Sequence, residues 1–73
     1  MSPRLPVLSG RQVVTALTRA GFAMVSQKGS HVKLRHPDGR TAIVPMHHEL
    51  AVGTLHSILR QCQWTADNLI EFL

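Results

Sequence analysis

The stretch KGSHVKLRHPDGRTAIV, residues 28–44, decides the fold because an alternating run lies between two turn signals. Residues 28–30 are typical of a tight turn, and residues 37–39 are Pro-Asp-Gly, a sequence that β-turns favour. Between them, polar and apolar residues alternate from His31 to His36, as in a strand with one buried face. The stretch therefore predicts a central β-strand with a turn on each side.

Two further strands are expected beside the central one. Phe22 to Gln27 contains an aromatic and a β-branched residue, which favour extended structure. Thr41 to Val44 is a third short run of this kind, and Pro45 stops it because proline cannot donate a ladder hydrogen bond. Since only short loops join the three runs, the sequence predicts an antiparallel meander.

A helix is predicted before the strands, from Gly10 to Ala20. Ser9 is a typical N-cap residue, and Gln12 three residues later completes a capping box. Gly21 supplies the left-handed conformation that commonly ends a helix. The apolar residues between them recur at helical spacing. The predicted apolar stripe consists of Val13, Ala16, Leu17 and Ala20.

Two helices are predicted after the strands, beyond a loop from Met46 to Gly53. We expect Thr54 to cap the second main helix and Thr65 to cap a last short helix. Trp64, which lies between these helices, is expected to close the end of the core. The apolar sides comprise Leu55, Ile58, Leu59 and Cys62 in the second main helix, and Leu69, Ile70, Phe72 and Leu73 in the last.

These elements predict an α+β fold of order α-β-β-β-α(-α). Two amphipathic helices need an apolar surface to cover, and a three-stranded antiparallel sheet has two faces. The compact arrangement places both main helices on one face and leaves the other face uncovered. We expect residues 1–73 to form one domain, in which residues 1–8 are an extended N-terminal arm.

Positive charge is concentrated in the first part of the chain. Residues 1–40 contain seven Lys or Arg and one acidic residue, a net charge of +6. Residues 41–73 contain one Arg and three acidic residues, a net charge of −2, so that the two parts add to the formal charge of +4. This asymmetry favours a polyanionic partner, and a nucleic acid is the first candidate. On charge alone, a basic surface that is merely solvated is an equally good interpretation.

The cysteine content and the hydropathy pattern indicate the cellular compartment in which the protein works. Cys62 is the single cysteine, so no disulfide can form within the chain, which fits a reducing compartment. Two prolines and an arginine interrupt the N-terminal residues, and no apolar run approaches the roughly 20 residues that span a bilayer. We therefore expect a cytoplasmic protein without membrane contact.

The central strand is expected to present a histidine among cations on the uncovered face. Val32 and Leu34 would meet the helices, which leaves His31, Lys33 and Arg35 on the other side. Cations bind phosphate, and a histidine that titrates near neutrality can act as a general base or acid in RNA cleavage. On spacing alone, an ordinary surface histidine is the competing interpretation.

The other four histidines are weaker candidates for chemistry. His36 lies on the inward side of the strand and is expected to pack or cap there, and His56 is expected at the surface of the second main helix. His47 and His48 are adjacent in a loop, which makes them poor joint ligands for one metal ion. Since the chain has no Cys-x-x-Cys, no His-Glu-x-x-His and no carboxylate cluster, we predict neither a metal site nor a cofactor.

Five segments carry a family resemblance: Gly21-Phe22, Gln27 to His31, Val44 to His47, Gly53 to Leu55 and Ile58 to Gln61. Together they resemble the HicA toxin family, and the Gly-Ser-His turn followed by a basic strand is the most specific element. The resemblance implies a fold similar to a double-stranded RNA-binding domain. It also implies metal-independent mRNA cleavage that inhibits translation, catalysis by the histidine of that turn, and neutralisation by a HicB-type antitoxin.

The residues expected to bind RNA surround the predicted catalytic residue, His31. Two alternatives stay open: a non-catalytic RNA-binding module that uses the same basic face, and an interaction domain for an acidic partner. The start of the second main helix has no Lys or Arg, unlike duplex-binding domains, and this argues against a pure duplex-binding module. His47 could support the site or contact the antitoxin. The predicted RNA-binding residues are Lys28, Gly29, Ser30, Lys33 and Arg35.

Overall fold

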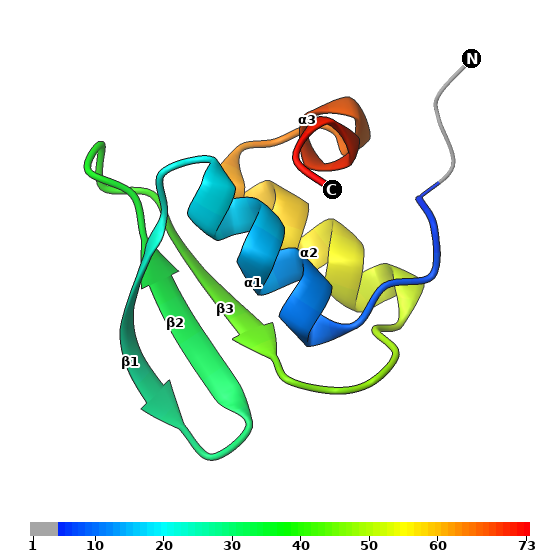
Figure 1. Cartoon of the computed structure of the whole chain (residues 1–73), viewed down its shortest axis with the longest axis horizontal. Coiled ribbons are helices and arrows are strands. Elements are labelled where there is room, and N and C mark those ends of the chain that lie inside the picture. The colour runs from blue at the N-terminus through cyan, green and yellow to red at the C-terminus, as the bar shows by residue number, and fades with distance from the viewer. Residues whose placement is uncertain (1–4) are drawn as a thin grey trace.

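One three-stranded antiparallel sheet and three helices make up the computed structural model, which describes residues 5–73. The predicted α+β order is confirmed, and Figure 1 shows both main helices on the same side of the sheet. None of the helices in residues 5–73 has the length and apolarity that crossing a membrane requires. The elements are α1 (Gly10–Arg19), β1 (Ala23–Lys28), β2 (His31–Arg35), β3 (Thr41–Pro45), α2 (Val52–Cys62) and α3 (Ala66–Glu71).

The sheet has the order β1-β2-β3, and β2 pairs antiparallel with both neighbours. Gly29 and Ser30 form the turn between β1 and β2, and the φ of +59° at Gly29 explains why glycine is needed there. In the pairing register, Lys33 lies between Ser26 on β1 and Ile43 on β3. The predicted meander and its turns are therefore confirmed.

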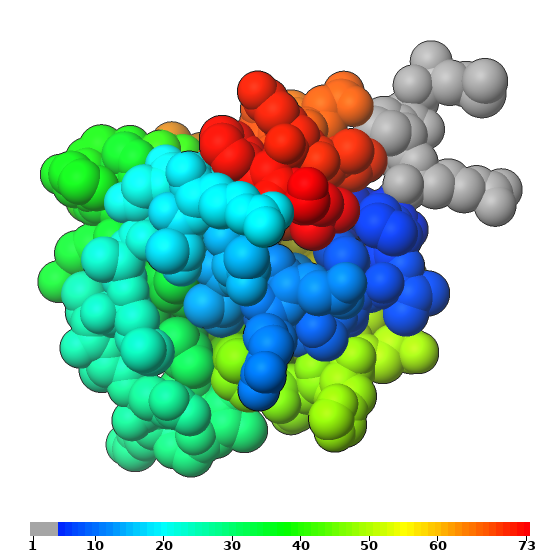
Figure 2. Space-filling model, viewed as in Figure 1, coloured from blue at the N-terminus to red at the C-terminus, as the bar shows by residue number. Residues whose placement is uncertain are grey.

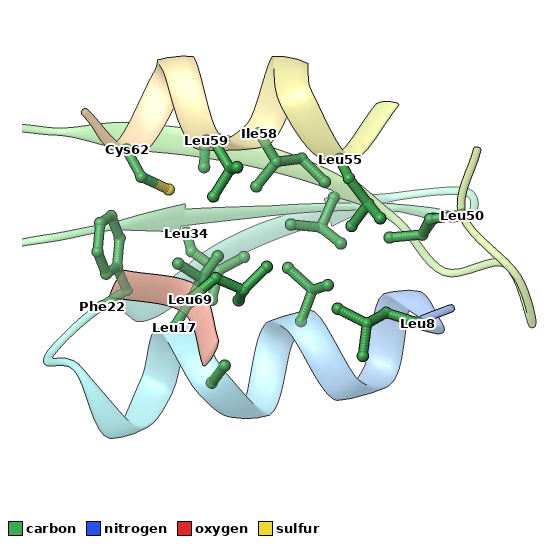
Figure 3. Packing of buried hydrophobic residues seen from close by; sticks show 14 of the residues in the cluster. Leu8, Leu17, Phe22, Leu34, Leu50, Leu55, Ile58, Leu59, Cys62 and Leu69 are labelled. Carbon is green, nitrogen blue, oxygen red and sulfur yellow. The ribbon is translucent and has the colours of Figure 1, made fainter. Parts of the chain in front are cut away.

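The core lies between the helices and the inner face of the sheet. Val32 and Leu34 on β2 are 2% and 0% exposed, as the alternation predicted. Figure 3 shows side chains of α1 and α2 converging on this face, with Leu69 of α3 joining them. The buried apolar residues are Leu8, Val13, Ala16, Leu17, Phe22, Val32, Leu34, Ala42, Val44, Leu50, Leu55, Ile58, Leu59, Cys62 and Leu69.

Helix α1 begins as predicted, with a complete capping box between Ser9 and Gln12. Its first residue, Gly10, is buried and donates its backbone N–H to the carbonyl of His47 at 2.9 Å. An ideal Cβ on Gly10 would collide with the Pro45 carbonyl oxygen and lie 2.9 Å from the Met46 Cα. Only glycine therefore allows α1 to start this close to the end of β3.

The prediction that Thr54 caps the second main helix is wrong, because α2 begins at Val52 and its N-cap is Ala51. The Ala51 side chain makes no capping hydrogen bond. The reason lies just before it, where Leu50 is buried and its N–H donates to the Leu8 carbonyl at 2.8 Å. This tertiary anchor turns the chain into the helix earlier than the capping signal indicated. The other ends of α1 and of the three strands agree with the prediction or differ from it by one residue.

The last helix is capped by Thr65 as predicted, but its apolar side is narrower than expected. Leu69 is buried, whereas Ile70 and Leu73, which were expected to pack, are 37% and 44% exposed. The helix has only six residues, so it buries only Leu69 in the core, while Ile70 and Leu73 stay in contact with solvent. Trp64 closes this end as predicted, stacked at 5.6 Å on Phe72.

The predicted N-terminal arm contributes to the core at its last residue. Residues 5–9 form neither helix nor strand, as expected, but Leu8 is only 3% exposed. Residues 1–4 of the predicted arm lie outside the described residues. The arm is therefore packed at the point where it enters α1.

The turn between β2 and β3 is tied to α2 by Arg40. Its guanidinium donates to the Asp38 carboxylate and to the Cys62 carbonyl, both at 2.8 Å, and lies over the ring of Phe22. The Arg40 backbone N–H, followed by its side chain and charge, holds the pKa of Asp38 below its usual 3.8. The carboxylate therefore stabilises the fold above that pH, and the contribution disappears as the pH falls through the folded-state pKa.

We expect acid to erase the difference in stability between the wild type and Asp38→Asn. The wild type should have the higher midpoint of thermal unfolding at a pH of about 6, and the two midpoints should converge as the pH falls through the lowered pKa of Asp38 and its carboxylate becomes protonated. Thermal unfolding followed by circular dichroism across this range checks the prediction. A gap that widens on acidification would contradict the assigned role of Asp38.

A second pH effect is expected at Cys62, whose thiol is buried. Burial raises its pKa from 9.0 to about 11, so the thiol is neutral and shielded in the folded protein. The stability that this provides is present below a pH of about 9 and decreases as the pH rises toward about 11. Iodoacetamide should therefore modify Cys62 slowly in buffer and rapidly in denaturant, as mass spectrometry can measure.

Candidate nucleic-acid interface

The uncovered face of the sheet carries the polar side chains of β2. His31 and Arg35 are exposed and Lys33 is half-buried, while the residues between them face the helices. Because directly paired residues share a face, the neighbours of Lys33 on this surface are Ser26 and Ile43. The uncovered face is thus a basic strand with a small polar residue on one side and an apolar residue on the other.

A shallow hollow lies on this face and takes side chains from all three strands. Its lining combines one imidazole, two ammonium groups, one hydroxyl and one aliphatic side chain. The aliphatic side chain is that of Ile43, which is 45% exposed although it is apolar. The hollow is lined by Ser26, Lys28, His31, Lys33 and Ile43, and we call it the sheet hollow.

His31 is held in position by strand pairing on both sides. It is the first residue of β2 and pairs with Lys28 on β1 and Pro45 on β3. The turn before it is fixed as well, since the Met46 N–H donates to the Ser30 carbonyl at 2.6 Å. The backbone beneath the imidazole is therefore constrained, whereas the ring itself is open to solvent.

The electrostatics of the sheet hollow favour an anion. Lys28 and Lys33 flank His31, and the lining contains no carboxylate. Of the acidic residues, Asp38 is held by Arg40 at the opposite turn, and Asp67 and Glu71 belong to α3. A phosphate in the hollow would therefore meet two cations and a histidine that can donate or accept a proton.

The structure brings together three of the six predicted site residues in this hollow: Lys28, His31 and Lys33. Arg35 lies on the same face, two residues beyond Lys33 on β2, where its Nε donates to the Thr41 hydroxyl at 3.3 Å. Gly29 and Ser30 are exposed at the adjoining turn and are not among the lining residues. Their roles toward RNA stay predictions.

Sequence reasoning missed two lining residues, Ser26 and Ile43. A signal for both was present in the loop lengths, because a two-residue turn after Lys28 places Ser26 opposite Lys33. The same reasoning across the second turn places Ile43 on the other side of Lys33. Register, and not residue type, identifies these two positions.

The expectation that His36 packs or caps is confirmed. Its ring meets Phe22 edge-on at 5.1 Å, and its Nδ1 accepts the Asp38 N–H at 3.2 Å. An ideal Cβ on Gly21 would come within 3.1 Å of its Nε2, so the ring also fills the space beside that glycine. His56 is exposed on α2, as predicted.

The His, Cys, Asp and Glu side chains of residues 5–73 are scattered over the structure. No group of three or more His, Cys, Asp or Glu side chains in this part of the chain lies close enough to hold a metal ion. His47 and His48 follow β3 in a connecting segment and are both exposed.

The protein is thus a small α+β domain with its two main helices on one face of the sheet and a basic hollow that suits a phosphate on the other face. Residues 10–64 match the family model described as the HicA toxin of bacterial toxin–antitoxin systems. The match covers α1 through Trp64 and includes the whole sheet hollow. The chain therefore belongs to the HicA toxin family, and membership in a toxin–antitoxin family implies an antitoxin partner. No curated protein sequence matches the chain.

Proposed function

We propose that this HicA-family toxin is a metal-independent endoribonuclease that cleaves mRNA and thereby inhibits translation. The proposal rests on the sheet hollow, which is lined by the exposed His31 together with Lys28, its partner on β1, and Lys33 on β2. RNA contains its own nucleophile, so one positioned base and nearby positive charge are enough for slow cleavage.

In the proposed reaction, a ring nitrogen of His31 takes the proton of an RNA 2′-hydroxyl. The 2′-oxygen forms a bond to the adjacent phosphorus as the bond from phosphorus to the 5′-oxygen breaks. The leaving 5′-oxygen gains a proton from the imidazolium or from water. The strand is thereby cut into two fragments, of which one ends in a 2′,3′-cyclic phosphate and the other begins with a 5′-hydroxyl. Lys28 and Lys33 stabilise the charge that develops on the phosphoryl oxygens.

The exposed Ile43 suggests how the hollow holds RNA without strong sequence preference. An aliphatic side chain can contact the face or sugar of any nucleotide, and no aromatic side chain lines the hollow to stack a base. The cationic side chains and the apolar contact of Ile43 bind the sugar-phosphate backbone of RNA and do not distinguish one base from another. We therefore propose that cleavage depends mainly on access to single-stranded backbone.

The proposed partner is a HicB-type antitoxin that covers the same face. The face joins exposed cations with an exposed apolar residue, Ile43, a combination that suits a protein interface as well as RNA. An antitoxin bound there would exclude RNA from His31 and neutralise the toxin. Antitoxin and RNA should therefore compete for the toxin.

The test uses purified toxin and a labelled single-stranded RNA in excess chelator. We expect cleavage to persist and a 2′-O-methyl copy of the RNA to stay intact, because methylation removes the nucleophile. Complete loss of cleavage in chelator would refute the metal-free mechanism. Binding of the methylated RNA without any cleavage of the natural RNA would instead favour a non-catalytic RNA-binding module.

The two lysines provide a separate prediction. Lys28→Gln and Lys33→Gln should each lower the cleavage rate about tenfold or more, since each removes positive charge from the developing phosphoryl oxygens. Arg60→Gln is the matched control because Arg60 is an exposed cation near the end of α2, outside the sheet hollow. Equal losses in all three variants would show that only overall charge matters.

A further inference from the structure

A second basic hollow lies where α1 begins, beside the segment that follows β3. Figure 1 shows this segment, the start of α1 and the turn between β1 and β2 at the same end of the molecule, and Figure 2 shows the surfaces of the first two adjoining. The hollow is lined by Ser9, Arg11, Met46, His47 and His48, and we call it the helix hollow.

The walls of the helix hollow are held by backbone contacts. The Gly10 N–H donates to the His47 carbonyl at 2.9 Å, which fixes the two sides of the hollow to each other. Gly10 packs directly on Pro45 and Met46, so the segment after β3 cannot move away without breaking this contact. The side chains that line the hollow therefore extend from a constrained backbone.

The lining provides donors and positive charge. Arg11 is exposed and permanently charged, and it can bind a phosphate with two parallel hydrogen bonds. His47 and His48 add imidazole groups on the opposite wall. Glu49 follows them in sequence, but it is not among the lining residues. The helix hollow thus has the chemistry of an anion site without depending on the helix dipole.

The helix hollow is connected to the sheet hollow through a few residues. Pro45 pairs with His31, and the next residue, Met46, donates its N–H to the Ser30 carbonyl at 2.6 Å. Two peptide links of about 3.8 Å each separate Pro45 from His47. With a paired-strand spacing of about 5 Å, the Cα atoms of His31 and His47 lie within about 13 Å. Two phosphates a few nucleotides apart on one single-stranded RNA can span a separation of this size.

We propose that the helix hollow is a second backbone subsite, which binds a phosphate of the same RNA strand a few nucleotides from the bond at His31. The proposal rests on the proposed function, because it extends the RNA path from the sheet hollow. It assigns Arg11 and His47 to RNA binding and leaves proton transfer to His31. A substrate with one phosphate can use only one hollow, whereas a longer strand can occupy both.

The experiment compares two ligands on the wild type and on the double variant Arg11→Gln/His47→Gln. The long ligand is a 2′-O-methyl RNA of about twelve nucleotides, whose affinity is measured at several salt concentrations. The short ligand is a dinucleoside monophosphate, whose cleavage is measured as kcat/KM. We expect the double variant to bind the long RNA about tenfold more weakly, with a salt slope reduced by about one. The loss for the short ligand should be less than about twofold.

The matched control is Arg60→Gln/His56→Gln, which removes the same residue types from the exposed surface of α2. It should bind the long RNA as the wild type does. Equal losses for both ligands, or no loss for the long RNA, would overturn the second subsite while cleavage by the wild type left the proposed function intact. Weaker antitoxin binding with unchanged RNA affinity would also overturn it, because the hollow would then be a protein contact. Absence of RNA cleavage by the wild type would refute the proposed function itself.

Discussion

Replacing His31 with alanine is expected to lower the rate of RNA cleavage by a factor of about 10² to 10⁴, the usual contribution of a general base. Expression of the variant should no longer arrest growth. The fold should be retained, because the His31 ring is exposed and forms no part of the core. Cleavage of a labelled RNA under single-turnover conditions, together with circular dichroism of the same samples, checks both parts.

His56→Ala is the matched control for this experiment. His56 is also exposed, but it lies on α2, away from the sheet hollow. The control should cleave RNA and arrest growth as the wild type does. If His31→Ala cuts RNA at the original rate, the catalytic assignment is wrong, and if both variants lose activity, a general sensitivity of the protein is responsible.

Gly10→Ala is expected to have the largest effect on stability. Its Cβ would collide with the Pro45 carbonyl and approach the Met46 Cα at 2.9 Å, and neither backbone atom can rotate away. Overpacking of this kind costs about 3 kcal/mol. A chain of this length has about 4 to 11 kcal/mol of unfolding free energy, so the variant should lose a large part of it. Chemical denaturation measures the difference.

Gly53→Ala is the same chemical change as Gly10→Ala, but it is expected not to lower the free energy of unfolding. Gly53 lies in the first turn of α2, where an added Cβ meets no atom within 4 Å. Since alanine is the better helix former, the variant should be as stable as the wild type or up to about 1 kcal/mol more stable. Equal destabilisation by both substitutions would show that the contact of Gly10 with the end of β3 is not the cause.

The sheet could be predicted from the sequence because its signals are local. Alternation around Val32 and Leu34 fixed which face is buried, and two turn sequences set the limits of β2. The same alternation placed His31 and Lys33 on the uncovered face, where the structure has them. Local signals also predicted the capping box at Ser9, because its two partners are three residues apart.

The features that sequence reasoning missed depend on contacts between distant parts of the chain. The start of α2 is set by Leu50, which is anchored to Leu8 across the molecule, and Thr54 gave a misleading local signal. The exposure of Ile70 depends on how much of α3 reaches the core. The helix hollow was not foreseen because Arg11 and His47 are distant in sequence and meet only through packing of α1 against the end of β3.

RNA is expected to bind across the uncovered sheet face at His31, and NMR titration of the isotope-labelled toxin with a 2′-O-methyl RNA checks this binding site. The largest chemical-shift changes are expected at Ser26, Lys28, His31 and Lys33, with little change along the exposed side of α2. Shifts concentrated on α2, with the His31 resonances unmoved at saturating RNA, would contradict it.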